Sequence, residues 1–208
     1  KNTFLKEKGG TIATQLEFDR HWGLGSSSTL ISNLSQWSKT NPYLLLENSF
    51  GGSGYDIACA TAKKPLVYQM NNPVPEIKEV EFDPSFKSNL FFVYLNQKKN
   101  SSIAVQQFKN IEVSPEKVLQ TSALTRQLID AKKQSDFELY MMQHENLLGE
   151  ILGLKTIKEI YFQDYQGAVK SLGAWGGDFI LASGDKNTPD YFKEKGFKVV
   201  IPYEEMVY

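Results

Sequence analysis

A glycine- and serine-rich loop that runs into a helix is the feature that most constrains how this chain folds. The loop reads Gly23-Leu24-Gly25-Ser26-Ser27-Ser28. The alternation of apolar and polar residues over 11–18 predicts a strand before it. Behind it, apolar side chains recur at helical spacing and predict a helix: Leu30, Ile31, Leu34 and Trp37. Ser32 and Ser35 fall on the opposite, polar face of that helix.

Composition narrows what such a chain can bind. The 208 residues are 41% hydrophobic with a net charge of -1, which suits one large or two small folded domains and gives no long-range attraction to a nucleic acid. No apolar run approaches the roughly 20 residues that span a bilayer, so we expect no membrane contact. A single cysteine, Cys59, cannot form an internal disulfide. We expect a cytoplasmic protein, a monomer or homodimer, that binds a small molecule.

The pattern along the chain predicts two parts, residues 1–84 and residues 85–208. In the first part, Asn41-Pro42 predicts the start of a short helix that ends near Glu47. Residues 56–62 are small and alanine-rich, which is typical of a helix that packs closely, with Cys59 buried in it. Residues 71–84 hold prolines and charges without a long period, so they are the predicted passage between the two parts.

The second part alternates strand and helix patterns. Strands are predicted at 90–95, 179–182 and 198–201, long helices at 114–131 and 137–152, and a short helix at 189–195. The second long helix offers a predicted core stripe: Leu139, Met142, Leu147, Leu148 and Ile151. These elements predict a mixed fold of the α+β class.

The first glycine loop has two interpretations from its residues alone. The start of a helix has N–H groups without intrahelical partners, and glycines before it let a phosphate approach the backbone. The loop has neither the lysine of a Walker A sequence nor the spacing of a dinucleotide fold, so any phosphate site here follows another scheme. The alternative is a serine-capped helix after a tight turn.

A second glycine loop, Gly51-Gly52-Ser53-Gly54, leads to Asp56 at the start of the next predicted helix. An aspartate beside a hydroxyl group can accept its proton during phosphoryl transfer. The alternative role for Asp56 is to cap that helix. Taken by itself, Glu47, just upstream, is a solvated residue at a helix end.

A third glycine loop, residues 173–177, follows near the end of the chain. Trp175 interrupts its glycines. From its residues alone, the loop can be interpreted as a hairpin-like turn with this tryptophan in the core. A donor-rich cluster before it could hold an anionic acceptor, although exposed lysines in loops are common: Lys98, Lys99, Ser101 and Ser102. His21 is interpreted as a surface or packing residue.

Together the three loops, in this order, resemble the motifs of the GHMP kinase superfamily, which includes galactokinase, homoserine kinase, mevalonate kinase and phosphomevalonate kinase. The resemblance covers nearly all of the chain, and the stretch from Gly52 to Asp56 is most similar to phosphomevalonate kinases. Asp19 stands where the family usually has a proline. The family's first motif, which carries a lysine, is not among these residues, so we expect the native chain to begin before Lys1. The resemblance implies an incomplete amino-terminal βαβ-type domain and a ferredoxin-like carboxy-terminal domain, with ATP held between them.

The resemblance also implies roles for individual residues. The ATP phosphates would lie against Gly23, Leu24, Gly25, Ser26, Ser27 and Ser28. Asp56 would be catalytic, and Mg²⁺ would be bound by Ser27 and Glu47. The acceptor would contact Ser53, Gly54, Gly173, Ala174, Gly176 and Gly177.

The activity implied by the resemblance is transfer of the γ-phosphoryl group of ATP to a small acceptor, mevalonate or phosphomevalonate before a sugar. Three alternatives stay open: an enzyme like diphosphomevalonate decarboxylase, a sugar kinase, and a catalytically silent homologue that binds a ligand. Trp175, in place of a loop glycine, keeps the silent homologue among them.

Overall fold

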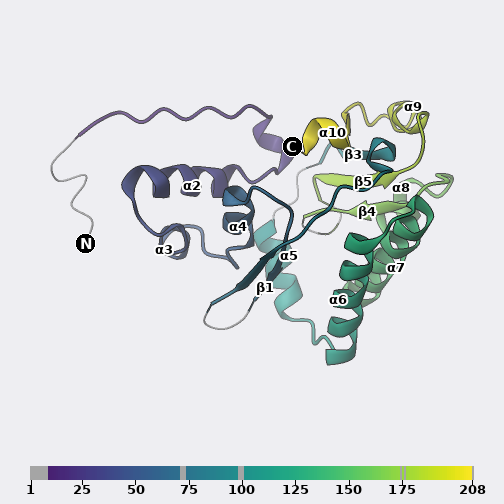
Figure 1. The fold of residues 1–208 in the computed structure, drawn as a ribbon, viewed down its shortest axis with the longest axis horizontal. Helices are drawn as coiled ribbons and strands as arrows, with labels where there is room; N and C mark the ends of the chain where they lie inside the picture. Colours follow the sequence, from purple (N-terminus) through teal and green to yellow (C-terminus); the bar gives the residue numbers. More distant parts are fainter. Residues whose placement is uncertain (1–8, 71–73, 98–100, 174, 176, 208) are drawn as a thin grey trace. The chain divides into compact units, whose positions relative to one another are not determined.

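The computed structural model describes residues 9–70, 74–97, 101–173, 175 and 177–207. The chain divides into two compact units, Lys1–Glu81 and Phe82–Tyr208, and Figure 1 labels the elements of each. The predicted division at residue 84 falls in the same stretch of sequence, and the assignment of each part to a kinase domain stays a prediction. Within the described residues, no helix is long and apolar enough to cross a bilayer.

The first unit is built from short helices and one hairpin. Its elements are η1 (Arg20–Trp22), α2 (Ser26–Ser38), α3 (Pro42–Glu47), α4 (Tyr55–Thr61), β1 (Leu66–Gln69) and β2 (Glu76–Glu79). The predicted helix after the first glycine loop is confirmed as α2. The short helix predicted after Asn41 is confirmed as α3, and Asn41 caps it by accepting a hydrogen bond from the N–H of Tyr43. Helix α2 packs against both α3 and α4.

One prediction for the first unit is wrong, and another missed a strand. Residues 11–18 form no strand, and most of their side chains are exposed, including Ile12 and Leu16. A strand needs a neighbour for its N–H and C=O groups, and no other strand among the described residues pairs with this segment. The predicted passage over 71–84 contains β2, which pairs antiparallel with β1 from Leu66 opposite Glu79.

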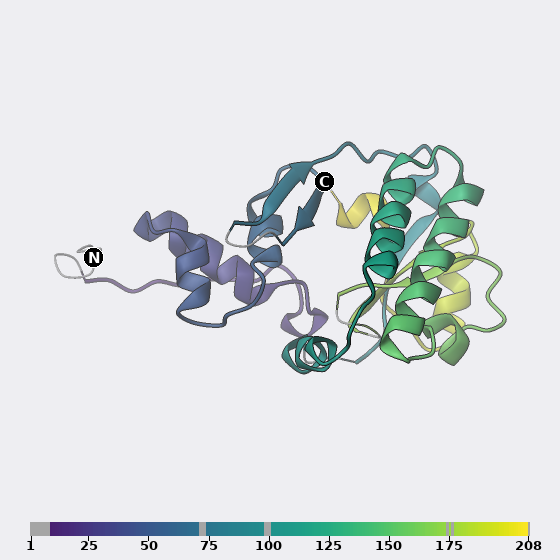
Figure 2. The same ribbon diagram turned by 90° about the horizontal axis from the view of Figure 1, so that it is seen from below.

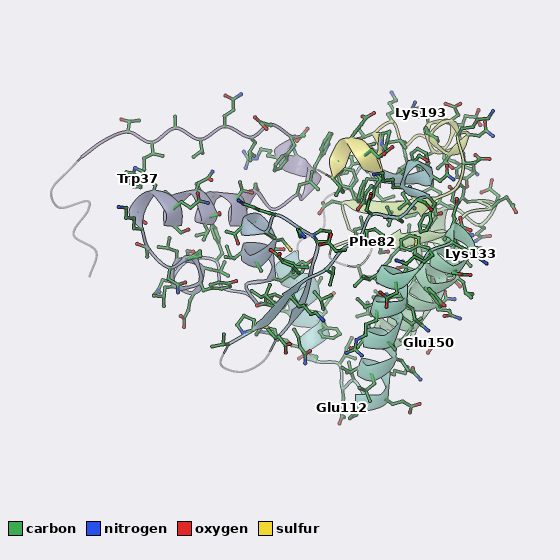
Figure 3. All side chains as sticks on the ribbon, in the orientation of Figure 1. Trp37, Phe82, Glu112, Lys133, Glu150 and Lys193 are labelled. Atoms are coloured by element: carbon green, nitrogen blue, oxygen red, sulfur yellow. The ribbon has the colours of Figure 1, made fainter. Side chains whose placement is uncertain are left out.

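The buried face of α2 also differs from the prediction. Ser28, Ser32 and Ser35 are buried with Ile31, whereas Leu30 is 37% and Trp37 43% exposed. Figure 3 labels Trp37 at the far end of α2. The Ser28 and Ser35 hydroxyls donate to backbone oxygens of Gly25 and Ser32, each over 2.8 Å. Because these small polar groups are satisfied by their own helix, they can face the neighbouring helices at little cost.

The second unit is organised around a four-stranded antiparallel sheet. Its strands are β3 (Leu90–Tyr94), β4 (Val169–Ser171), β5 (Phe179–Ser183) and β6 (Val200–Pro202), in the order β4-β5-β3-β6. Two predicted strands are confirmed as β3 and β5, and the last one is confirmed in part as β6. The chain runs strand, helices, strand, strand, helix, strand, which is the order of the ferredoxin-like motif.

Helices cover both faces of this sheet. The helices of the second unit are η2 (Lys87–Asn89), α5 (Ser101–Lys109), α6 (Pro115–Asp130), α7 (Gln134–Leu152), α8 (Ile157–Tyr161), α9 (Thr188–Glu194) and α10 (Tyr203–Met206), and buried residues of α7, α8 and α9 pack on the sheet in the core clusters. One core cluster joins α7 to Leu90 and Leu181, and the other joins α8 and α9 to Val93 and Ile180. The views in Figures 1 and 2 both show α6 beside α7. The predicted helices that became α6, α7 and α9 are confirmed, whereas α5 had no counterpart in the sequence prediction.

The predicted core stripe of α7 is in the wrong phase. Leu139 is 47% and Met142 38% exposed. The other predicted members of the stripe are half-buried: Leu147, Leu148 and Ile151. The buried face is formed by other residues: Phe137, Met141, His144, Glu145 and Gly149. Both sets have helical spacing, so periodicity alone could not separate them. Glu145 on the true face accepts hydrogen bonds from Ser171 of β4, and no local pattern contains this information.

Candidate functional site

The start of α2 is an open helix terminus. Gly23 and Gly25 both adopt left-handed backbone conformations, with φ of 67° and 76°. Gly25 is the N-cap residue, and no side chain caps the helix. A Cβ atom at Gly25 would lie 2.8 Å from Oγ of Ser28, so this position requires glycine. The alternative of a serine-capped helix is therefore wrong.

Backbone N–H groups are what this terminus offers a ligand. The first intrahelical bond runs from the N–H of Thr29 to the carbonyl of Gly25, so the N–H groups of the three serines before it have no intrahelical acceptor. The Ser27 side chain is exposed and that of Ser26 half-buried, whereas the buried Ser28 hydroxyl is already bonded to Gly25. The arrangement suits an anion, because the helix dipole adds to the N–H groups.

Asp19 forms the entry to this loop. Its carboxylate accepts hydrogen bonds from the N–H and from Nδ1 of His21, at 2.8 and 2.9 Å, and it caps η1. The hydrogen bond from the backbone N–H of His21 holds the pKa of Asp19 below its usual value. His21 is exposed, as the surface interpretation predicted. Sequence reasoning noted Asp19 only as a departure from a motif and missed this capping role.

The second glycine loop, like the first, ends in a left-handed glycine that begins a helix without a side-chain cap, here α4. Gly54 is a buried N-cap residue with φ of 81°, and no side chain caps α4. Its missing Cβ would lie 2.8 Å from the ring of Tyr43, and the hydroxyl of Tyr68 donates to the carbonyl of Ser53 over 2.5 Å. Asp56 is the second residue of α4 and is exposed. The alternative that Asp56 caps this helix is therefore wrong, and two tyrosines that the sequence analysis had not selected hold the loop.

Tyr55 and Cys59 lie one turn apart beside Asp56. Burial of the phenol, then the Cys59 thiol and the Asp56 carboxylate, raise the pKa of Tyr55 to about 12. Partial burial raises the pKa of the Cys59 thiol. Cys59 is nevertheless exposed, so the prediction of a buried packing residue is wrong. The outer side of α4 is in solvent, because α2 and β1 take its other side.

The predicted magnesium ligands lie on neighbouring elements. Ser27 is in the first turn of α2, and Glu47 is the last residue of α3, with both side chains exposed. The described residues contain no group of three or more His, Cys, Asp or Glu side chains that could hold a metal ion. One hydroxyl and one carboxylate are consistent with a magnesium ion that keeps water and phosphate oxygens as its other ligands. This ligand set stays a prediction.

The third loop connects β4 to β5 in the second unit. The N–H of Leu172 bonds to the carbonyl of Phe179 over 3.1 Å, so the loop closes an antiparallel hairpin. Gly173 has φ of 65° with open space where a Cβ would be, and Gly177 is buried. The half-buried ring of Trp175 lies 3.7 Å from the Cβ position of Gly149 on α7. The hairpin-like turn is thus confirmed, whereas Trp175 is half-buried and belongs to neither core cluster of the described residues.

Several predicted residues lie outside the described part of the chain or are described by their backbone alone. Ala174, Gly176, Lys98 and Lys99 are outside the described residues, and Ser101 and Ser102 are described by backbone alone, as the first residues of α5. The first unit contains Gly23 to Ser28, Glu47, Ser53, Gly54 and Asp56, and its helix α2 packs against α3 and α4. Gly173 and Gly177 belong to the second unit.

Comparisons with known proteins bear on the fold. No protein-family model matches the chain, and no curated protein matches its sequence. A crystal structure of a mevalonate kinase matches with a TM-score of 0.60 and 19% identity over 88% of this chain. The mevalonate kinase of Methanococcus jannaschii matches with 0.62 and 20% over 89%, and the Lin0012 protein of Listeria innocua with 0.62 and 18% over 98%. The chain therefore has a fold similar to that of these mevalonate kinases.

The chain covers only part of the proteins that it matches. The chain spans 64% of the length of each of the two mevalonate kinases and 72% of the Listeria innocua protein. At these identities the likeness is one of fold, with mixed helix and sheet as predicted. Substrate and activity have to be argued from the residues.

Proposed function

We propose that this protein is an ATP- and magnesium-dependent kinase of the GHMP type. It transfers the γ-phosphoryl group of ATP to a hydroxyl or phosphate group of a small acceptor, with mevalonate and phosphomevalonate the first candidates. The observation that carries the proposal is the pair of uncapped, glycine-led helix starts at α2 and α4. They belong to two helices that pack against each other, and Asp56 is exposed in the first turn of the second.

Each part of this arrangement has a chemical task in phosphoryl transfer. Catalysis of this reaction consists largely of positioning and of charge stabilisation. The N–H groups of Ser26 and Ser27 would bind phosphate oxygens, and the Ser27 hydroxyl and Glu47 would ligate Mg²⁺, which neutralises charge on the phosphates. Asp56 would orient the acceptor hydroxyl and accept its proton.

A coupled assay of ADP release tests the proposal. The protein would be supplied with Mg²⁺, ATP and one acceptor at a time: mevalonate, phosphomevalonate, then sugars. ADP formation that depends on one acceptor supports the kinase. Release of carbon dioxide with diphosphomevalonate would instead indicate the decarboxylase. Absence of turnover with every acceptor, together with no binding of Mg-ATP in calorimetry, would contradict the proposal and favour a silent homologue.

Replacing Asp56 tests its role separately. Asp56→Asn should lower turnover at least ~100-fold because it removes an acid–base group, while the affinity for Mg-ATP measured by calorimetry stays nearly the same. Asp190→Asn is the matched control, since Asp190 is also an exposed aspartate in the first turn of a seven-residue helix. Equal turnover of the Asp56 variant and the unmodified protein would remove Asp56 from the chemistry.

A further inference from the structure

A buried charged cluster lies where β4 meets the third glycine loop. Glu145 of α7 is only 2% exposed. Its carboxylate accepts hydrogen bonds from the hydroxyl and the N–H of Ser171, at 2.6 and 3.1 Å. The ammonium group of Lys170 lies 3.9 Å from the same carboxylate, and the Lys170 side chain is 18% exposed. None of these residues has a role in the proposed chemistry.

The position of Glu145 beside the edge of the sheet explains which backbone group it binds. Strand β4 pairs only with β5, so it is an edge strand. An edge strand has a row of unpaired backbone groups, and Glu145 binds one of them, the N–H of Ser171. Ser171 is the last residue of β4. Leu172 and Gly173 follow at once, so Glu145 holds the strand at the point where the loop begins.

The same helix also supports the loop's tryptophan. Glu145 and Gly149 are one turn apart on α7, and both are buried. A Cβ at Gly149 would lie 2.9 Å from the carbonyl of Leu154 and 3.7 Å from Cζ2 of Trp175. The Leu154 carbonyl is therefore the group that requires a glycine here, and the indole ring packs beside the same position at an ordinary contact distance. One face of α7 therefore contacts the loop at its start and again at its middle residue.

Burying a carboxylate is costly unless its partners compensate. Burial raises the pKa of Glu145, and the hydrogen bonds from Ser171 and the charge of Lys170 oppose that rise. Burial likewise lowers the pKa of Lys170, against the effect of Glu145. A hydrophobic pair of the same size would often be at least as stable. Such a cluster is better explained by the geometry that it imposes than by net stability.

We propose that Glu145 is a positioning residue for the third glycine loop, fixing through Ser171 and Lys170 the direction in which Leu172 and Gly173 leave the sheet. Glu145 itself touches no substrate. On the proposed function, the loop contacts the acceptor, and Glu145 acts through it. This second step rests on the proposed function, whereas the placement of the loop does not.

Fluorescence of Trp175 measures the placement of the loop directly. In a background of Trp22→Phe and Trp37→Phe, Trp175 is the only tryptophan. Glu145→Gln removes the charge opposite Lys170 and leaves an amide that can accept through one atom only. Acrylamide quenching of Trp175 should rise at least about twofold as the loop loosens. The milder Ser171→Ala, which keeps the charge pair and the N–H bond, should give a smaller rise in the same direction.

Glu138→Gln is the matched control. Glu138 lies on the same helix, and its carboxylate accepts a hydrogen bond from the Ser183 hydroxyl over 2.7 Å, much as Glu145 binds Ser171. It should leave Trp175 quenching unchanged. Equal quenching in the Glu145 and Glu138 variants would overturn the proposal. So would quenching of the Glu145 variant, or of the Ser171 variant, that equals that of the parent protein with Trp175 alone.

Kinetics of the same variants test the link to function. In the Glu145 variant, KM for the acceptor should rise about tenfold with KM for ATP nearly constant, and the Ser171 variant should follow it weakly. If the unmodified protein turns over no acceptor, the proposed function fails while the fluorescence result still decides the role of Glu145. An unchanged acceptor KM alongside raised quenching would overturn the functional step alone.

Discussion

At the scale of single residues, His144 shows how burial makes this protein sensitive to acid. It is 9% exposed, and Nδ1 has no hydrogen-bond partner within the described part of the chain. Burial, and then the charge of Lys170, lower its pKa from 6.5 to about 4. Between pH 6.5 and pH 4, the His144 imidazole therefore binds a proton in the unfolded chain but stays neutral in the folded protein. Its contribution to stability is complete above pH 6.5 and is lost as the pH falls towards 4.

His144→Gln should remove this pH dependence. Between pH 7 and pH 4.5, the unmodified protein should lose up to about 3 kcal/mol of unfolding free energy more than the variant. Urea unfolding at several pH values measures the difference. His21→Gln is the comparison, because His21 is the other histidine of the chain and is exposed; the change of slope should be larger for the His144 variant. Parallel curves for the His144 variant and the unmodified protein would contradict the prediction.

At the scale of elements, the start of α4 depends on one glycine. Gly54 has a left-handed conformation, and its Cβ position lies 2.8 Å from the Tyr43 ring. Gly54→Ala should destabilise the first unit by about 2–3 kcal/mol, from backbone strain together with displacement of the ring. Gly51 has a similar φ, 67°, with nothing within 4 Å, so Gly51→Ala should cost only about 1 kcal/mol. Denaturant unfolding followed by circular dichroism compares the two, and equal losses would show that the Tyr43 contact is unimportant.

Elements also show why sequence reasoning succeeded in some places. Asn41, Pro42 and the glycines at 23 and 25 act on the residues beside them, so the starts of α2 and α3 could be predicted from local pattern. Glycine conformation and helix capping depend on neighbours in the chain. The positions of Tyr43 and Tyr68 against the second loop could not be predicted, because each contacts residues more than ten positions away.

At the scale of the whole molecule, the hydrophobic core is unevenly divided. Among the described residues, the buried hydrophobic side chains of the first unit are Ile31, Ile57 and Ala58, and all others lie in the second unit. Apolar burial is the main favourable term in folding, so the two units should differ in stability.

Hydrogen exchange should reveal this difference. Amides of α2 and α4 should exchange at least ~100-fold faster than those of β3 and β5, because local opening costs less where little apolar surface is buried. Mass spectrometry of exchanged peptides measures both regions in one sample of the intact chain. Equal protection of α2 and β5 would contradict the prediction. On the proposed function, Mg-ATP should raise protection at the start of α2, and α9 serves as the reference that stays constant.

The sequence by itself determined the α+β class, three glycine loops in order, and most of the long helices and core strands. These features depend on side-chain alternation, capping residues and glycine conformation, which act over a few residues. Only the tertiary structure decided which face of each helix is buried. Ser32, Ser35 and Glu145 are inside, whereas Leu30, Leu139 and Met142 are outside, because the choice depends on partners brought together from distant parts of the chain.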